Sequence, residues 1–140
     1  MKVLHSVLLL AALMALPACA GSRTPTGAAP RVPFGQEFTL AVGESAAVAD
    51  TGVVLRLQAV ADDSRCPADV QCVWEGDALV HVAATGPGSV RQAYELHAGR
   101  GPREAEHEGL RIRLVRLDPP ARSDRAPRPS DYRVTLLVFG

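Results

Sequence analysis

Three cysteines are the residues of this 140-residue chain whose chemistry depends on spacing: Cys19, Cys66 and Cys72. A thiol can be acylated, exchange electrons or form a disulfide. Cys66 and Cys72 are six positions apart, with Pro67 starting a turn between them, and so short a loop is easily bridged. Redox pairs typically have two residues between them at a helix N-terminus, where the thiolate is stabilised. The spacing therefore favours a structural disulfide in an oxidising compartment over a redox site.

The N-terminal segment has the composition of an export signal. A single Lys at position 2 precedes the apolar run Val3 to Leu16, which is too short to span a bilayer stably. The run ends in Leu16-Pro17-Ala18-Cys19, which resembles the bacterial lipobox. The resemblance implies that residues 1–18 are a lipoprotein signal peptide and that Cys19 carries the lipid anchor. Cleavage by an ordinary signal peptidase at the neighbouring alanines is the alternative that the residues leave open.

Lipidation also explains the odd number of cysteines, because an acylated Cys19 leaves Cys66 and Cys72 to pair. Residues 19–33 hold three prolines and no apolar pattern, so we expect a lipidated flexible tether there. A single β domain is expected over residues 34–140. Ala20 after the cysteine resembles the sorting signal of outer-membrane lipoproteins, which implies a protein held in the cell envelope, on the outer membrane facing the periplasm.

The charge balance excludes one class of partner. Fifteen Lys plus Arg balance fifteen Asp plus Glu, and a formally neutral chain has no electrostatic basis for binding nucleic acid. The sequence contains no Gly-x-Ser-x-Gly elbow, no His-Glu-x-x-His zinc motif and no Gly-rich phosphate loop. We therefore expect a protein that is not an enzyme and holds no cofactor.

The elements that position these residues are predicted to be strands. Apolar and polar residues alternate with a period of two in six segments bounded by Gly and Pro: residues 37–42, 53–60, 70–84, 90–96, 110–114 and 132–138. Gly86-Pro87-Gly88 predicts a hairpin, and the last segment, apolar on both faces, is expected inside a sheet. The pattern predicts an all-β fold of about seven strands, an antiparallel β-sandwich (Ig-like) or a small barrel. Polar, mobile loops are expected at residues 98–109 and 118–130.

The only tryptophan, Trp74, falls on the apolar face of the expected strand over residues 70–84. Val70, Cys72 and Val80 share this face, and acidic residues occupy the opposite one. The pattern predicts Trp74 as a buried core residue beside the disulfide. Gly76 is expected at a bulge or at the close approach of another backbone segment. An exposed Trp74 that anchors a partner is the alternative.

The centre of the chain carries a motif: Asp63-Ser64-Arg65-Cys66-Pro67, then Cys72-Val73-Trp74, Gly76 and Ala78. It resembles a pattern shared by a family of uncharacterised bacterial secreted proteins and lipoproteins. The resemblance covers residues 36–139 and supports the domain boundary and the disulfide, and it implies no activity. From charge alone, Arg65 is expected to fix the loop through an ion pair with Asp63 or Glu75.

Histidines and carboxylates give no metal-binding pattern. His81, His97 and His107 lack the short spacing of zinc sites, and the acidic residues between Asp62 and Asp77 lack the spacing of a calcium loop. We expect the three histidines, together with Glu106 and Glu108, to be solvated, and we expect no metal to bind.

The function hypothesis is an envelope-anchored lipoprotein whose non-enzymatic β-sandwich has a binding or accessory role. The membrane, reached through Cys19, and an envelope protein are the expected partners. The alternative is a peptidase inhibitor that presents the Cys66–Cys72 loop, pre-organised by its disulfide.

Overall fold

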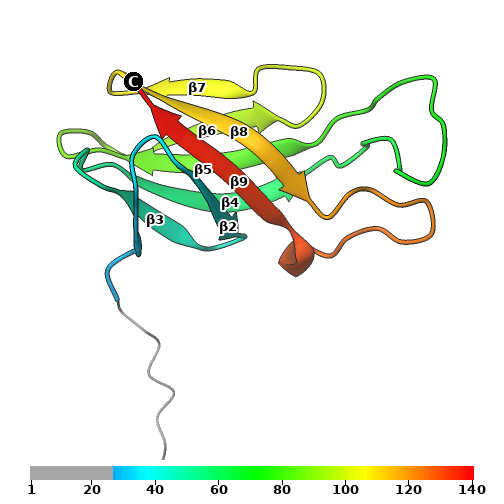
Figure 1. The fold of residues 1–140 in the computed structure, drawn as a ribbon, viewed down its shortest axis with the longest axis horizontal. Coiled ribbons are helices and arrows are strands. Elements are labelled where there is room, and N and C mark those ends of the chain that lie inside the picture. The colour runs from blue at the N-terminus through cyan, green and yellow to red at the C-terminus, as the bar shows by residue number, and fades with distance from the viewer. Residues whose placement is uncertain (1–26) are drawn as a thin grey trace, which may run out of the picture.

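The computed structural model describes residues 27–140, which form two packed sheets and no α-helix (Figure 1). The elements have these bounds: β1 Arg31–Val32, β2 Glu37–Ala41, β3 Ser45–Val48, β4 Val54–Ala61, β5 Leu79–Thr85, β6 Gln92–His97, β7 Glu104–His107, β8 Leu110–Asp118, the 3-10 helix η1 Pro129–Asp131 and β9 Arg133–Phe139. One sheet has the order β1-β3-β4-β5-β6, and the other has the order β2-β9-β8-β7. The predicted all-β fold is confirmed, in its sandwich form. The predicted signal peptide and Cys19 lie outside the described residues.

Strand pairing is antiparallel in both sheets except between β1 and β3, which run parallel. β9 lies between β2 and β8, as its two-sided apolar pattern predicted. The inward faces of four strands supply most of the fully buried large side chains: Leu55, Leu57, Val80, Val82, Ile112, Leu114, Val134, Leu136 and Val138. Each such side chain stabilises the fold by roughly 1.5–3 kcal/mol relative to exposure.

Three strands lie where the sequence predicted none. β3 has the sequence Ser-Ala-Ala-Val, which is too small and too short to give a clear period, although Ala46 and Val48 are buried. β1 occupies the end of the predicted tether, so the folded part begins at Arg31 rather than near Phe34. β7, with the sequence Glu-Ala-Glu-His, forms an edge strand inside the predicted mobile loop 98–109.

His107 on β7 is buried, which corrects the expectation of a solvated side chain. Its exposed fraction is 1%, and its Nδ1 lies 3.0 Å from the hydroxyl of Tyr94 and 3.3 Å from Oε1 of Gln92. β6 and β7 are edge strands of different sheets, so these residues close one side of the sandwich. On β5, His81 pairs with Glu95, because the β5–β6 hairpin centres on Gly88, one residue after the middle of the predicted turn Gly86-Pro87-Gly88.

Three long connections lie at one end of the sandwich, on the right of Figure 1 and opposite the labelled C-terminus. They are residues 62–78 between β4 and β5, residues 98–103 between β6 and β7, and residues 119–132 between β8 and β9. We call this end the loop end, and we call residues 62–78 the disulfide loop. The antiparallel order of the strands brings these three segments together, and they hold most of the motif.

Candidate functional site

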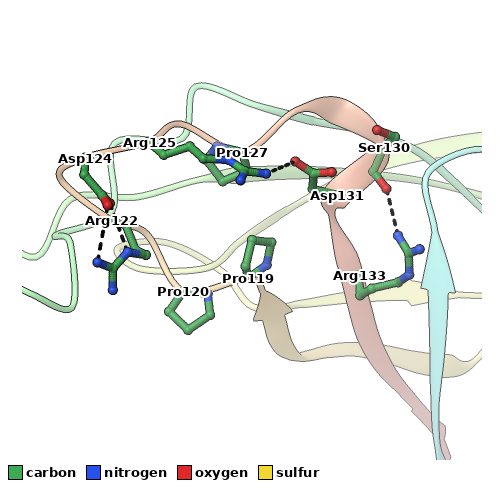
Figure 2. A pocket seen from close by; sticks show the side chains of 9 residues that line it. All are labelled: Pro119, Pro120, Arg122, Asp124, Arg125, Pro127, Ser130, Asp131 and Arg133. Atoms are coloured by element: carbon green, nitrogen blue, oxygen red, sulfur yellow. Dashed lines mark hydrogen bonds and ion pairs between the residues drawn. The ribbon is translucent and has the colours of Figure 1, made fainter.

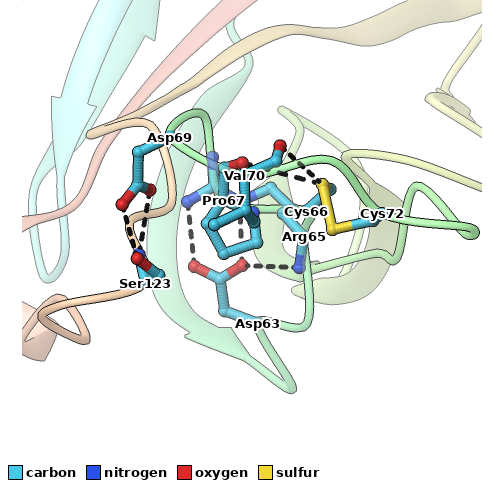
Figure 3. The surroundings of a disulfide bond; sticks show 8 residues. All are labelled: Asp63, Arg65, Cys66, Pro67, Asp69, Val70, Cys72 and Ser123. Carbon is cyan, nitrogen blue, oxygen red and sulfur yellow. Dashed lines mark hydrogen bonds and ion pairs between the residues drawn. A yellow bond between two sulfur atoms is a disulfide. The ribbon is translucent and has the colours of Figure 1, made fainter.

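The disulfide loop folds back on itself as a narrow hairpin. The backbone N–H of Ser64 donates to the carbonyl of Asp77 at 2.7 Å, and that of Cys66 donates to the carbonyl of Glu75 at 2.8 Å. The predicted disulfide is confirmed: Cys66 and Cys72 are bridged, with their Cα atoms 5.9 Å apart (Figure 3). The disulfide therefore closes the outer part of a loop that backbone hydrogen bonds already hold at its base.

Gly76 permits this close pairing. Its φ is +67°, a left-handed conformation that side chains rarely adopt. A Cβ atom at this position would overlap the carbonyl oxygen of Ser64 on the opposite arm of the hairpin. Another backbone segment thus approaches Gly76 closely, which is one of the two roles that the sequence predicted for it.

Arg65 ties the loop to the end of β8. Its Nε donates to Oδ1 of Asp63 and its Nη2 donates to Oδ2, both at 2.8 Å, in the expected loop-fixing ion pair. Its Nη1 also donates to the carbonyl of Leu117 and its Nη2 to that of Pro119, both at 2.9 Å. The two charged side chains are only 14% and 11% exposed. A planar guanidinium suits this site because one side chain reaches a carboxylate and two carbonyls together.

Tyr132, just before β9, completes the cluster by donating its hydroxyl to Oδ2 of Asp63 at 2.9 Å. Burial acts to raise the pKa of Asp63, but hydrogen bonds from Arg65 and Tyr132 outweigh it and hold that pKa below its usual value. Burial and the bond to the Asp63 carboxylate raise the pKa of Tyr132 to about 12. The motif residues Asp63 and Arg65 are therefore ionised partners that hold the loop in place.

The raised pKa of Tyr132 predicts a specific loss of stability in alkali. Below pH 10 the phenol is protonated in both states, so its contribution is complete there. Between pH 10 and about 12 the unfolded chain loses this proton first, so stability falls by on the order of 2 kcal/mol. Urea unfolding from pH 8 to 12 should show this fall, and Tyr132→Phe should reduce its slope. Parallel curves for the two proteins would contradict the assignment.

A second set of contacts joins the disulfide loop to residues 119–132. The carboxylate of Asp69 accepts the backbone N–H of Ser123 at 3.0 Å and the Ser123 hydroxyl at 2.5 Å (Figure 3). The backbone N–H of Ala68 donates to the carbonyl of Ala121 at 2.8 Å. Pro67 lies beside these contacts and starts the turn in which Val70 donates its N–H to the Pro67 carbonyl. The outer part of the disulfide loop is thus attached to its neighbour.

Asp77 links the disulfide loop to residues 98–103. Its Oδ1 accepts the N–H groups of Ala78 and Gly99 at 2.8 and 2.7 Å, and its Oδ2 lies 2.5 Å from Nδ1 of His97. Burial opposes ionisation of Asp77, but these hydrogen bonds, led by that of His97, keep its pKa below the usual value. One carboxylate therefore fixes the positions of two loops.

Trp74 is exposed, so its predicted role as a core residue is wrong. Its exposed fraction is 68%, that of Val73 is 90% and that of Val70 is 46%. The sheet begins only at Leu79, because residues 64–77 pair with each other inside the loop. Among residues 27–140 no second sheet covers this hairpin, so the alternating pattern marks a two-sided loop. We call the exposed side chains of Val70, Val73 and Trp74 the loop tip.

Arg100, from the β6–β7 connection, covers part of the Trp74 ring. Its guanidinium carbon lies 5.1 Å from the ring centroid, within the range of a cation–π interaction. Because Asp77 bonds to neighbouring Gly99, the cluster that fixes the loop also places this arginine. The site therefore consists of the exposed apolar loop tip, with the Arg100 guanidinium over one face of the Trp74 indole.

Two side chains suited to catalysis or metal binding, those of His97 and Ser64, have other partners. The imidazole of His97 lies between two carboxylates, with Nε2 at 3.6 Å from Oε1 of Glu95, and the Ser64 hydroxyl donates to the carbonyl of Asp77. Within residues 27–140, no group of three or more His, Cys, Asp or Glu side chains could hold a metal ion. No helix of the same region is long and apolar enough to cross a membrane.

Comparisons with protein-family models, with curated proteins and with solved structures gave no match for this chain.

Proposed function

We propose that the protein is an envelope-anchored binding module and that it contacts an envelope protein through the loop tip. The observation that carries the proposal is the exposure of Trp74 and Val73 on a loop that is fixed in place. A few residues supply most of the binding energy in protein interfaces, and tryptophan is enriched among them. A tip fixed before binding loses little conformational entropy when it binds.

The fixed position of the tip rests on three independent attachments. Arg65 holds the base of the loop to β8, Asp69 holds its outer part to Ser123, and Asp77 holds its return arm to Gly99. Two of these charged side chains, Arg65 and Asp77, are partly buried. Partly buried charges are expected in a surface loop that must keep one shape. This supports a binding role for the tip over that of a simple connection between β4 and β5.

The proposed anchor is the lipid on Cys19. The lipobox at residues 16–19 supports this part of the proposal, and the disulfide is consistent with an oxidising compartment. Folded chain begins at Arg31, about a dozen residues after Cys19, so a tether of this length would keep the domain close to the membrane. The expected partner is therefore a protein of the same envelope.

A peptidase is the second candidate partner. It is favoured by the disulfide, which closes the segment next to the tip, because a constrained protruding loop can enter a cleft without becoming ordered there. In this case the protein that binds the loop tip would be a peptidase, and its activity would fall on binding.

Photo-crosslinking in cells tests the proposal with a control of the same residue type. Val73 at the tip and Val90 at the opposite end of the sandwich are 90% and 86% exposed, so each can carry a photoreactive amino acid. We expect a discrete adduct from position 73 and none from position 90. Cys19→Ser should release the protein from membranes and lower the adduct yield. Equal adducts from both positions would refute the loop tip as the contact surface. Unchanged membrane partition of Cys19→Ser would refute the lipid anchor.

A further inference from the structure

The connection between β8 and β9 forms a pocket of about 560 Å³ at the loop end (Figure 2), and no residue of the loop tip lines it. Its volume is in the range of small-ligand sites. Pro119, Pro120 and Pro127 give it apolar walls, and arginine and aspartate side chains provide its polar groups. Most of the lining comes from residues 119–131, with Arg133 contributed by the start of β9.

The pocket is held in shape by contacts already described. Arg65 donates to the carbonyl of Pro119, and Asp69 accepts both polar hydrogens of Ser123. At the other end, the N–H of Arg128 donates to Oδ2 of Asp131 at 2.9 Å and closes the turn of η1. A segment with so many prolines and these three attachments is pre-organised for a ligand.

Charge in the pocket is not balanced. Arg122 neutralises Asp124, with Nε to Oδ1 at 2.9 Å. Asp131 interacts with both Arg128 and Arg125, at 3.2 and 3.6 Å. A hydrogen bond from the Arg128 backbone and another from its guanidinium lower the pKa of Asp131, so this carboxylate is ionised. Both acidic groups of the lining are thus compensated, and positive charge remains.

Arg133 carries the remaining charge in a fixed position. Its Nη1 donates to the carbonyl of Ser130 at 2.9 Å and to that of Tyr132 at 2.8 Å. Within residues 27–140 no carboxylate lies within 4.0 Å of its guanidinium nitrogens, and its Nε and Nη2 make no hydrogen bond. These two nitrogens form the edge that binds a carboxylate through two parallel hydrogen bonds.

We propose that this pocket binds a carboxylate, with Arg133 as its anchor and the proline rings against the apolar part of the ligand. One anchored guanidinium matches the single charge of a carboxylate better than the charge of about −1.5 to −2 on a phosphate at pH 7. The carboxylate belongs either to a small organic acid or to the C-terminus of a peptide chain. This site is separate from the loop tip, so the carboxylate-binding proposal does not depend on the proposed function.

Four probes test the pocket on the full-length exported protein, purified in detergent and labelled with ¹⁵N. They are acetate, N-acetyl-trialanine with a free carboxylate, its C-terminal amide and inorganic phosphate. We expect a saturable shift of the Arg133 Nε–H resonance with at least one of the two carboxylates, and affinity about ten-fold or more above that of the amide. Saturation by acetate indicates a small acid as the ligand, and saturation by the tripeptide alone indicates a chain terminus.

Arg133→Gln removes the reporting Nε–H, so binding to the variants is followed by ligand-induced shifts of the backbone amides of residues 119–133. Arg133→Gln should abolish these shifts, whereas Arg56→Gln, on the outer face of the other sheet, should leave them unchanged. The dispersed amide spectrum reports whether each variant is folded. The proposal is overturned if the amide binds as well as the acid, if phosphate binds more tightly than both carboxylates, or if folded Arg133→Gln still binds the carboxylate.

Discussion

Arg65→Ala is expected to lower the free energy of unfolding by about 3–5 kcal/mol, the usual cost of leaving a buried charge without its partner. Asp63 is only 11% exposed and would keep its charge while losing two hydrogen bonds from the guanidinium. The carbonyls of Leu117 and Pro119 would lose their donors as well. Urea unfolding at neutral pH measures the change.

Arg113→Ala is the matched control for this variant. Arg113 forms an ion pair of 2.6 Å with Glu104, but its side chain is 44% exposed, so its loss should cost less than about 1 kcal/mol. Arg65→Lys should also be costly, because an ammonium group cannot reach the carboxylate and both carbonyls in the same geometry. Equal losses for Arg65→Ala and Arg113→Ala would show that the cluster does not hold the loop.

Trp74→Ala is expected to separate binding from stability. An anchor residue of an interface contributes about 2 kcal/mol or more, so crosslinking from Val73 should need a partner concentration about 30-fold higher. The free energy of unfolding should change by less than about 1 kcal/mol, because only a surface contact with Arg100 is lost. Titrating purified partner against the crosslinkable protein measures the first quantity, and urea unfolding measures the second.

The matched control for this result is Val90→Ala, which removes another highly exposed apolar side chain. It should leave both the crosslinking and the stability unchanged. A fall of about 3–5 kcal/mol for Trp74→Ala would instead indicate a buried residue, as the sequence pattern suggested, and would remove the basis of the proposed interface.

The sequence was informative about the strands that make the core. Residues 53–60 alternate because one face of β4 packs against the second sheet. The last segment, residues 132–138, forms the inner strand β9, as expected. β1, β3 and β7 could not be found in this way. Two of them are very short or made of small residues, and β7 is a polar edge strand whose one buried residue, His107, is a histidine.

In the candidate site, too, some features could be predicted from the sequence and others could not. The disulfide and the Arg65–Asp63 pair follow from residues close together in the sequence, and both were expected. The exposure of Trp74 was not expected, because a period-two pattern does not show whether another sheet covers it. The contacts of Asp77 and Tyr132 join residues 20 and 69 positions apart, and only the fold brings these groups together.

The central claim, that Trp74 is an exposed anchor for a partner, can be tested on a single signal. Trp74 is the only tryptophan, so protein labelled with 5-fluorotryptophan gives one ¹⁹F resonance. In the free protein this resonance should show the solvent isotope shift of an exposed indole. Solubilised envelope of the source cell should broaden or move it, and excess unlabelled protein, but not unlabelled Trp74→Ala, should restore it. A resonance without an isotope shift, or one that the envelope leaves unchanged, would contradict the account.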